Sequence, residues 1–207
     1  MFGVNATENE NVVVENQIKD VALSELHPFK NHPFKVIDDE KMDEMVESVK
    51  QYGVLVPAIV RERAEGGYEL ISGHRRHHAA VLAGLEEMPV IVKNCDDDES
   101  TVIMVDANIQ REDISVSEKA KAYRMKYDAM KHQGASGGIS LAEMSESAGE
   151  SRKTIQRLIY LSNLTEELLE LIDNKKIGIA QGVDLAFIPK EEQDVVFRVM
   201  QKTGVYI

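Results

Sequence analysis

The sequence predicts an α+β protein in which a small domain with a mixed β-sheet comes first and an all-α domain follows. Apolar segments of strand type lie only before residue 93, and two of them flank a Glu-Gly-Gly turn. After residue 139 every apolar pattern repeats at helical spacing. A short segment rich in glycine separates the two parts. We therefore expect a flexible arm at 1–20, a first domain at 21–133, a linker at 134–139 and a second domain at 140–207.

Composition limits the class of protein. The chain has 207 residues, 43% of them hydrophobic and 29% charged, which suffices for one good core and a smaller second one. No apolar run approaches the length of about 20 residues that crosses a bilayer, and the N-terminus lacks a signal-peptide pattern. We therefore expect a cytoplasmic protein with no membrane partner. The single cysteine, Cys95, excludes an internal disulfide.

Capping and turn residues predict the elements of the first domain. Prolines punctuate an extended stretch at 26–34, and Asp38 or Asp39 caps a helix that ends at Gly53. A hairpin follows, because strands flank the turn at 65–67. In chain order we expect strands at 57–61, 68–72 and 88–92, and helices at 74–82, from Asp96–Asp98 to Ile109, and from Ser115 or Ser117 to Gly134.

The second domain is predicted to contain a helix-turn-helix. An apolar first helix ends near Gly149, and Ser151 caps the next helix, whose first turns carry three cations and no acid. The net charge of the chain is -12, so any DNA binding must come from a local basic patch of this kind. The expected helices are 141–148, 151–161, 165–174, 181–187 and 190–202, and the packing face is expected to hold Leu141, Met144, Ala148, Ile155 and Leu158.

A strand that ends at Gly73 and runs into a helix starting with His-Arg-Arg is typical of an anion site. The first turn of a helix has unpaired N–H groups and positive dipole density, and arginines hydrogen-bond phosphate oxygens in pairs. Two other interpretations remain open. The arginines pair with nearby acids in a solvated first turn, or His74 and His78, one turn apart, bind zinc. A second polar block, at 108–111, is by itself also explained by helix capping.

Together the two blocks resemble the ParB family of partition proteins, and the order of the boxes is more specific than any one box. The family has a Pro-punctuated strand, a Gly-x-x-x-Pro turn, a Gly-Glu-Arg-Arg box and a Glu-Asn-x-Gln-Arg box. The similar segments here are Leu26-x-Pro28, Gly53 to Pro57, Gly73-His74-Arg75-Arg76 with Ala79-Ala80, and Ala107-Asn108-Ile109-Gln110-Arg111. The resemblance covers about residues 21–187 and implies a ParB N-terminal domain of sulfiredoxin-like fold before the helix-turn-helix domain.

The resemblance implies a CTP-dependent DNA clamp that acts in chromosome or plasmid segregation. In the family, CTP with Mg2+ lies between the two boxes, and a centromere-like site in double-stranded DNA promotes closure of a homodimer. A ParA-type ATPase as partner and a nucleoid-associated location are also implied. The residues implied for nucleotide binding are Gly53, Ser72, Gly73, His74, Arg75, Arg76, Asn108, Gln110 and Arg111, with Asn108 also the candidate on the metal side.

Two departures from the family pattern bear on this activity. The glutamate of the first box is His74 here, and that of the second box is Ala107. Neither a neutral imidazole nor a methyl group offers Mg2+ a hard anionic ligand. Asp106 is adjacent, but on a helix its side chain points about 100° away from that of Ala107. We therefore expect weakened or altered nucleotide binding and, at most, a slow CTPase.

The candidate DNA-reading residues lie mainly in one helix. Exposed polar residues at its start are expected to meet base edges, and the others to meet phosphates in part. The family's Gly-His-Ala-Arg segment corresponds to 177–186 here, which lacks the arginine, so the DNA site is expected to differ from the common chromosomal one. The candidates are Ser151, Arg152, Lys153, Thr154, Gln156, Arg157 and, from the later segment, Gln181.

Three other functions are alternatives to a partition protein. A transcription regulator that uses the same fold without nucleotide would bind only its operator. A sulfiredoxin-like enzyme would need a reactive cysteine where Gly73 stands, and the acids around Cys95 favour a raised thiol pKa. A nuclease would need a carboxylate cluster, which the sequence does not suggest.

Overall fold

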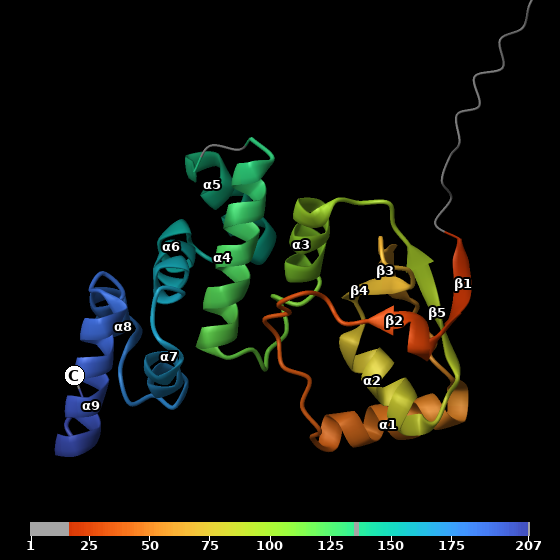
Figure 1. The fold of residues 1–207 in the computed structure, drawn as a ribbon, viewed down its shortest axis with the longest axis horizontal. Helices are drawn as coiled ribbons and strands as arrows, with labels where there is room; N and C mark the ends of the chain where they lie inside the picture. Colours follow the sequence, from red (N-terminus) through yellow and green to blue (C-terminus); the bar gives the residue numbers. More distant parts are fainter. Residues whose placement is uncertain (1–16, 135–136, 207) are drawn as a thin grey trace, which may run out of the picture.

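A five-stranded mixed sheet followed only by helices makes up the computed structural model, which describes residues 17–134 and 137–206 (Figure 1). The predicted α+β class is confirmed. The strands are β1 (Ile18–Ala22), β2 (Leu26–His27), β3 (Ala58–Glu62), β4 (Tyr68–Ser72) and β5 (Glu87–Val92), with a 3-10 turn, η1 (Leu23–Glu25). The helices are α1 (Glu40–Tyr52), α2 (His74–Ala83), α3 (Asp97–Asp106), α4 (Val116–His132), α5 (Gly137–Ala148), α6 (Arg152–Leu161), α7 (Glu166–Asp173), α8 (Ile179–Leu185) and α9 (Lys190–Thr203).

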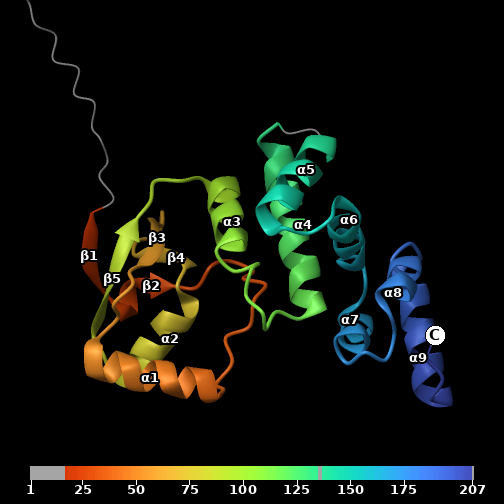
Figure 2. The same ribbon diagram turned by 180° about the vertical axis from the view of Figure 1, so that it is seen from behind.

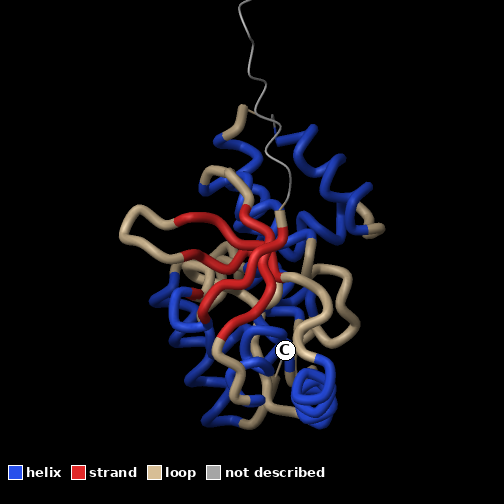
Figure 3. Tube along the Cα trace, turned by 90° about the vertical axis from the view of Figure 1, so that its right-hand side faces the viewer, coloured by secondary structure: helices blue, strands red, loops and turns tan. Residues whose placement is uncertain are grey.

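The sheet has the strand order β1-β5-β3-β4-β2. β3 and β4 form the predicted antiparallel hairpin, while β5 runs parallel to β3 and β2 parallel to β4. Figure 3, a view from the sheet end of the molecule, shows these strands curling side by side. The pairing of β3 with β4 places Ile59 opposite Ser72, so the start of β3 lies beside the end of β4. The chain after Ser72 therefore leaves the sheet where β3 starts and β4 ends.

The flexible arm was expected to extend to residue 20, but β1 already begins at Ile18. Residues 1–16 of that arm lie outside the described residues, but Ile18 to Asp20 belong to β1, which pairs antiparallel with β5. β1 is an edge strand, and Ile18, Lys19 and Asp20 are all exposed. The exposed Lys19 and Asp20 therefore concealed a strand that is defined by backbone pairing with β5 and by the buried Val21.

Side-chain caps begin the main helices where the sequence predicts them. Asp39 accepts from the backbone N–H of Met42 at the start of α1, which selects it over Asp38. Asp96 and Ser115 each form a capping box at the start of α3 and α4. None of the helices in the described residues is long and apolar enough to cross a membrane.

Two hydrophobic clusters stabilise the chain. One lies between the sheet and helices α1 and α2. The other begins at Ile71 on the opposite side of β4, includes Met104 of α3 and Tyr123 of α4, and continues through the later helices. Figures 1 and 2 show α3 and α4 between the sheet and helices α5 to α9, which extend away from it, while α1 and α2 lie beside the sheet. The two ends of the molecule are therefore joined by a packed core.

The expected linker at 134–139 is shorter in the structure. Residues 135–136 lie outside the described part, and residues 137–139 already belong to α5. Glycine-rich composition suggested a linker, but α5 packs against both α4 and α6, and such tertiary packing overrides a low helix propensity.

Candidate functional site

One cavity of about 200 Å³ brings the two polar blocks together. The first block enters it from the end of β4 and the first turn of α2, and the second from the end of α3. The lining residues are His32, Val36, Met45, Ser72, Gly73, His74, Arg75, Arg76, Ala107, Asn108 and Arg111. Seven of the nine residues expected to bind nucleotide are among them.

Gly73 makes the turn from β4 into α2. Its φ of +106° lies in the region that favours glycine, and an added Cβ would come within 2.8 Å of Cβ of Ala58. The close approach of β3 thus requires a residue without a side chain. The first-turn N–H groups of α2 follow at once, without partners inside the helix, and therefore suit an anion.

The two arginines of the first block are held differently. Arg75 contacts the carboxylate of Asp39 at 3.1 Å and keeps the pKa of that carboxyl below its usual value. Arg76 donates through one nitrogen to the carbonyl oxygens of Val56 and Pro57, at 2.6 and 2.7 Å. Arg76 thus has no carboxylate partner in the described chain, and its charge is balanced only by carbonyl dipoles.

In the second block, Asn108 and Arg111 line the cavity. Asn108 donates through Nδ2 to the carbonyl of Met104, at 2.8 Å, which leaves its Oδ1 as an acceptor. Arg111 pairs with Asp113 at 3.1 Å and lowers the pKa of that carboxyl.

Three residues considered for the site do not line the cavity. Gln110 donates to the carbonyl of Ser147 in α5, at 3.2 Å, and does not line the cavity. Gly53 ends α1 and is also absent from the lining. Asp106, the possible substitute for the missing glutamate, is hydrogen-bonded and ion-paired to Lys126 of α4.

Two stacked imidazoles form part of the cavity wall. The ring centres of His32 and His74 lie 3.7 Å apart. His74 accepts from the backbone N–H of Phe29 through Nε2, so its proton is placed on Nδ1 by the hydrogen-bond pattern. Burial, with the nearby His32 and His77, lowers the pKa of His74 to about 3. Both rings are neutral at pH 7, because burial also lowers the pKa of His32.

The zinc interpretation finds no further ligands in the described chain. His78 is paired with Asp38 at 2.7 Å. No group of three histidine, cysteine or carboxylate side chains there is placed to hold a metal ion.

Three residues that line the cavity were not predicted from the sequence: His32, Val36 and Met45. They come from the extended segment and from α1, far from both blocks in the chain. The prolines around His32 were a signal for a fixed loop, but only the folded chain shows that this loop covers the start of α2.

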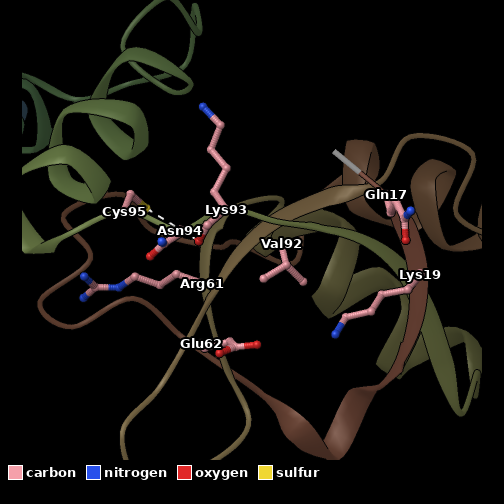
Figure 4. Close-up of a pocket in the computed structure, with 8 residues that line it drawn as sticks. All are labelled: Gln17, Lys19, Arg61, Glu62, Val92, Lys93, Asn94 and Cys95. Carbon is pink, nitrogen blue, oxygen red and sulfur yellow. Dashed lines mark hydrogen bonds between the residues drawn. The ribbon is translucent and has the colours of Figure 1, made fainter. Parts of the chain in front are cut away.

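A larger hollow of about 470 Å³ lies at the other end of β3 (Figure 4). It is lined by Gln17, Lys19, Arg61, Glu62, Val92, Lys93, Asn94 and Cys95. The guanidinium of Arg61 forms ion pairs with Glu69 and Asp97. Burial is the main cause that raises the pKa of the Cys95 thiol, which disfavours a reactive thiolate. We therefore assign the functional site to the smaller cavity.

The second candidate site is the exposed side of α6. Ser151 caps the helix by accepting from the N–H of Thr154 at 3.1 Å. Every candidate residue from Ser151 to Arg157 is exposed, whereas Ile155 and Leu158 are buried against the core as predicted. Within the described residues no ion pair engages Arg152, Lys153 or Arg157. Their charges are therefore available to an anionic partner.

Gln181 is exposed on α8, which packs against α6. Gly182 makes that packing possible, because an added Cβ would lie 2.6 Å from Cδ1 of Ile172 and 2.8 Å from Cδ2 of Leu161. Gln181 is thus carried by a helix that contacts α6.

Comparison with known proteins covers nearly the whole chain. The family model for the ParB N-terminal domain matches residues 7–109, and that for the ParB HTH domain matches residues 112–206. A nucleoid occlusion protein of Listeria monocytogenes is 30% identical over 188 residues, which are 90% of this chain and 63% of the relative. A probable chromosome-partitioning protein ParB of Vibrio cholerae is 29% identical over 188 residues, 91% of this chain and 62% of the relative. The chain thus spans less than two thirds of the length of these relatives.

A solved structure supports the fold. The C-terminally truncated chromosome-partitioning protein ParB from Caulobacter crescentus, complexed to the centromeric parS site, has a TM-score of 0.56 and 21% identity to this chain. The likeness covers 90% of this chain and 93% of that one. At this level of identity it shows the fold.

The two family matches meet ahead of α4, whereas the sequence led us to expect the division between the domains at 134–139.

Proposed function

Because this chain belongs to the ParB family, we propose that it is a partition protein that binds a centromere-like site in double-stranded DNA and binds CTP as a DNA clamp. The observation that carries the proposal is the convergence of the two polar blocks on one cavity at the start of α2. The name of the Vibrio cholerae relative, a probable chromosome-partitioning protein, supports the same role.

For the nucleotide, the cavity supplies the contacts that phosphates need. The first-turn N–H groups of α2 and the guanidinium of Arg76 donate to phosphate oxygens, while Arg75 and Arg111 add positive charge and keep their ion pairs with Asp39 and Asp113. The volume of about 200 Å³ is below the roughly 300 Å³ at which ordinary ligand pockets begin. We therefore assign it to the phosphates, with the base and sugar extending outside.

For DNA, α6 enters the major groove in the manner of a recognition helix. Ser151, Arg152, Lys153 and Thr154 lie at the N-terminal end, which reaches base edges in this motif. Gln156 and Arg157 follow on the exposed side, and Arg157 is suited to a phosphate. Gln181 contributes from α8.

Further partners follow from the same role. We propose a homodimer as the functional unit, a ParA-type ATPase as partner and a location on the nucleoid. With His74 and Ala107 in place of the two glutamates of the boxes, CTP hydrolysis is slow or absent.

The nucleotide part is tested by calorimetric titration with CTP, ATP, GTP and UTP, in the full chain and in Arg75→Ala. CTP-selective binding that Arg75→Ala abolishes supports the proposal. Binding of none of the four would make the chain a nucleotide-independent DNA-binding protein, such as a transcription regulator. Lys202→Ala, which removes an exposed cation on α9, is the matched control and is expected to bind as the parent chain does.

The DNA part is tested by selecting sites from a random duplex library and measuring affinity at several salt concentrations. One enriched sequence, bound at least about a thousandfold more tightly than bulk DNA, is expected. Equal binding to all duplexes would contradict a centromere-like site.

A further inference from the structure

We propose that the cavity at the start of α2 binds the polyphosphate of its nucleotide without a divalent cation. This inference rests on the proposed nucleotide function and concerns how that ligand is held. It is carried by the donor set of the cavity, which suits an anion and does not fit the Mg2+ ion that the family resemblance implies.

The cavity wall offers Mg2+ few ligands. Mg2+ prefers six oxygen ligands in octahedral geometry, and at phosphate sites the protein usually adds one or two carboxylates to the oxygens of the phosphates and of waters. Among the described lining residues there are three arginines and no aspartate or glutamate. The only side-chain oxygens are those of Ser72 and Asn108. Two uncharged oxygens beside three guanidinium groups do not make a magnesium site.

Each aspartate beside the cavity is already paired with a cation. Asp39 is held by Arg75 at 3.1 Å and Asp113 by Arg111 at 3.1 Å. The pKa of each of these two carboxyls is lowered, first of all by the hydrogen bond from its arginine. An incoming metal ion would have to displace an arginine to reach either carboxylate.

Asp106 is the third such aspartate. It follows the same pattern, because it pairs with Lys126, whose side chain is only 5% exposed. Asp39, Asp106 and Asp113 are therefore each paired with a cation of the chain itself.

Most polar groups of the wall are donors. Nε2 of His74 accepts from Phe29, so Nδ1 bears a hydrogen, and this buried nitrogen has no partner in the described chain. Because this nitrogen is buried, the donors available to phosphate oxygens are the guanidinium groups and the first-turn N–H groups. The acceptors of the wall are Oδ1 of Asn108, Oγ of Ser72 and Nε2 of His32, the last without a partner since Nδ1 of His32 donates to the carbonyl of Phe34. One imidazole nitrogen does not replace a set of oxygen ligands.

The test is calorimetric titration of the full chain with CTP, once with Mg2+ and once with EDTA. We expect dissociation constants that agree within about threefold. Binding that weakens by more than about tenfold in EDTA overturns the inference while leaving the nucleotide function intact. No binding in either buffer overturns the proposed nucleotide function itself, and this inference with it.

A gain of metal dependence gives an independent check. Ala107 lines the cavity and is exposed, so Ala107→Glu adds a carboxylate there without disturbing the core. We expect this variant to bind CTP about tenfold more weakly in EDTA, and Mg2+ to restore the affinity. Gln201→Glu, which adds the same charge on α9, is the control and is expected to show no dependence. If Ala107→Glu binds equally well with and without Mg2+, the argument from the donor set is wrong.

Discussion

Lys126 in α4 donates to the carboxylate of Asp106 at the end of α3 and to Oγ of Ser147 in α5, the latter at 3.0 Å. Asp106 is adjacent to Ala107 in the cavity wall, and Ser147 lies just before the turn of the helix-turn-helix. Gln110 donates to the carbonyl of the same serine. One buried ammonium thus joins the wall of the cavity at the start of α2 to α5, the helix that precedes α6.

The first prediction concerns this ammonium. Lys126→Met leaves Asp106 and Ser147 without their donor, and we expect the free energy of unfolding to fall by about 2 kcal/mol. The loss lies below the usual range for a broken buried pair, because the Asp106 side chain is 41% exposed and stays hydrated. Urea denaturation measures the change. In Asp106→Leu/Lys126→Met, which replaces the pair by apolar contact, most of the loss should be recovered; a double variant less stable than the single one contradicts this account.

The second prediction concerns the turn into α2. In Gly73→Ala the new methyl group meets Ala58 and the backbone keeps a positive φ, so we expect a loss of about 3 kcal/mol. Gly84→Ala is the control, since Gly84 also has a positive φ but nothing lies within 4 Å of the added Cβ. It should cost only about 1 kcal/mol. Equal losses of stability in the two variants, measured by thermal or urea unfolding, would show that the contact with Ala58 of β3 does not destabilise Gly73→Ala.

The third prediction concerns pH. His74 has a pKa of about 3 in the folded chain against 6.5 as its ordinary value, so the unfolded chain binds more protons between these limits. Stability therefore falls as the pH drops below 6.5, by at most about 1.4 kcal/mol per pH unit for this one group. His32 and His77, which contact or neighbour His74, act in the same direction.

The check is urea denaturation at about pH 7 and about pH 5, above the range in which carboxylates dominate. In His74→Gln the decrease between the two pH values should be smaller than in the parent chain by about 1 to 2 kcal/mol. An unchanged pH dependence in this variant would show that His74 does not titrate as its burial implies.

The fourth prediction concerns α6. Arg157→Ala is expected to weaken binding to all duplexes alike and to reduce the slope of log affinity against log salt by about 1, as for loss of one phosphate contact. Fluorescence anisotropy at several salt concentrations measures this. Lys202→Ala, outside the reading helix, should leave the slope unchanged. A loss confined to one DNA sequence would instead place Arg157 at a base edge.

Local sequence predicted the elements because their signals are local. Asp39, Asp96, Ser115 and Ser151 cap helices through hydrogen bonds to N–H groups within three residues, which a short pattern can specify. β1 was not predicted, because this exposed edge strand carries Lys19 and Asp20. Its identity depends on pairing with β5, about 70 residues away.

The sequence by itself determined the class, the two polar blocks and the capped, basic helix α6, since spacing and residue type suffice for these. Only the tertiary structure decided what surrounds the blocks. It placed His32 on His74, paired Asp39 with Arg75, and directed Gln110 toward α5 and away from the cavity. These contacts join residues that the chain separates widely, and whether a charge is free or paired depends on which side chains packing brings within a few ångströms.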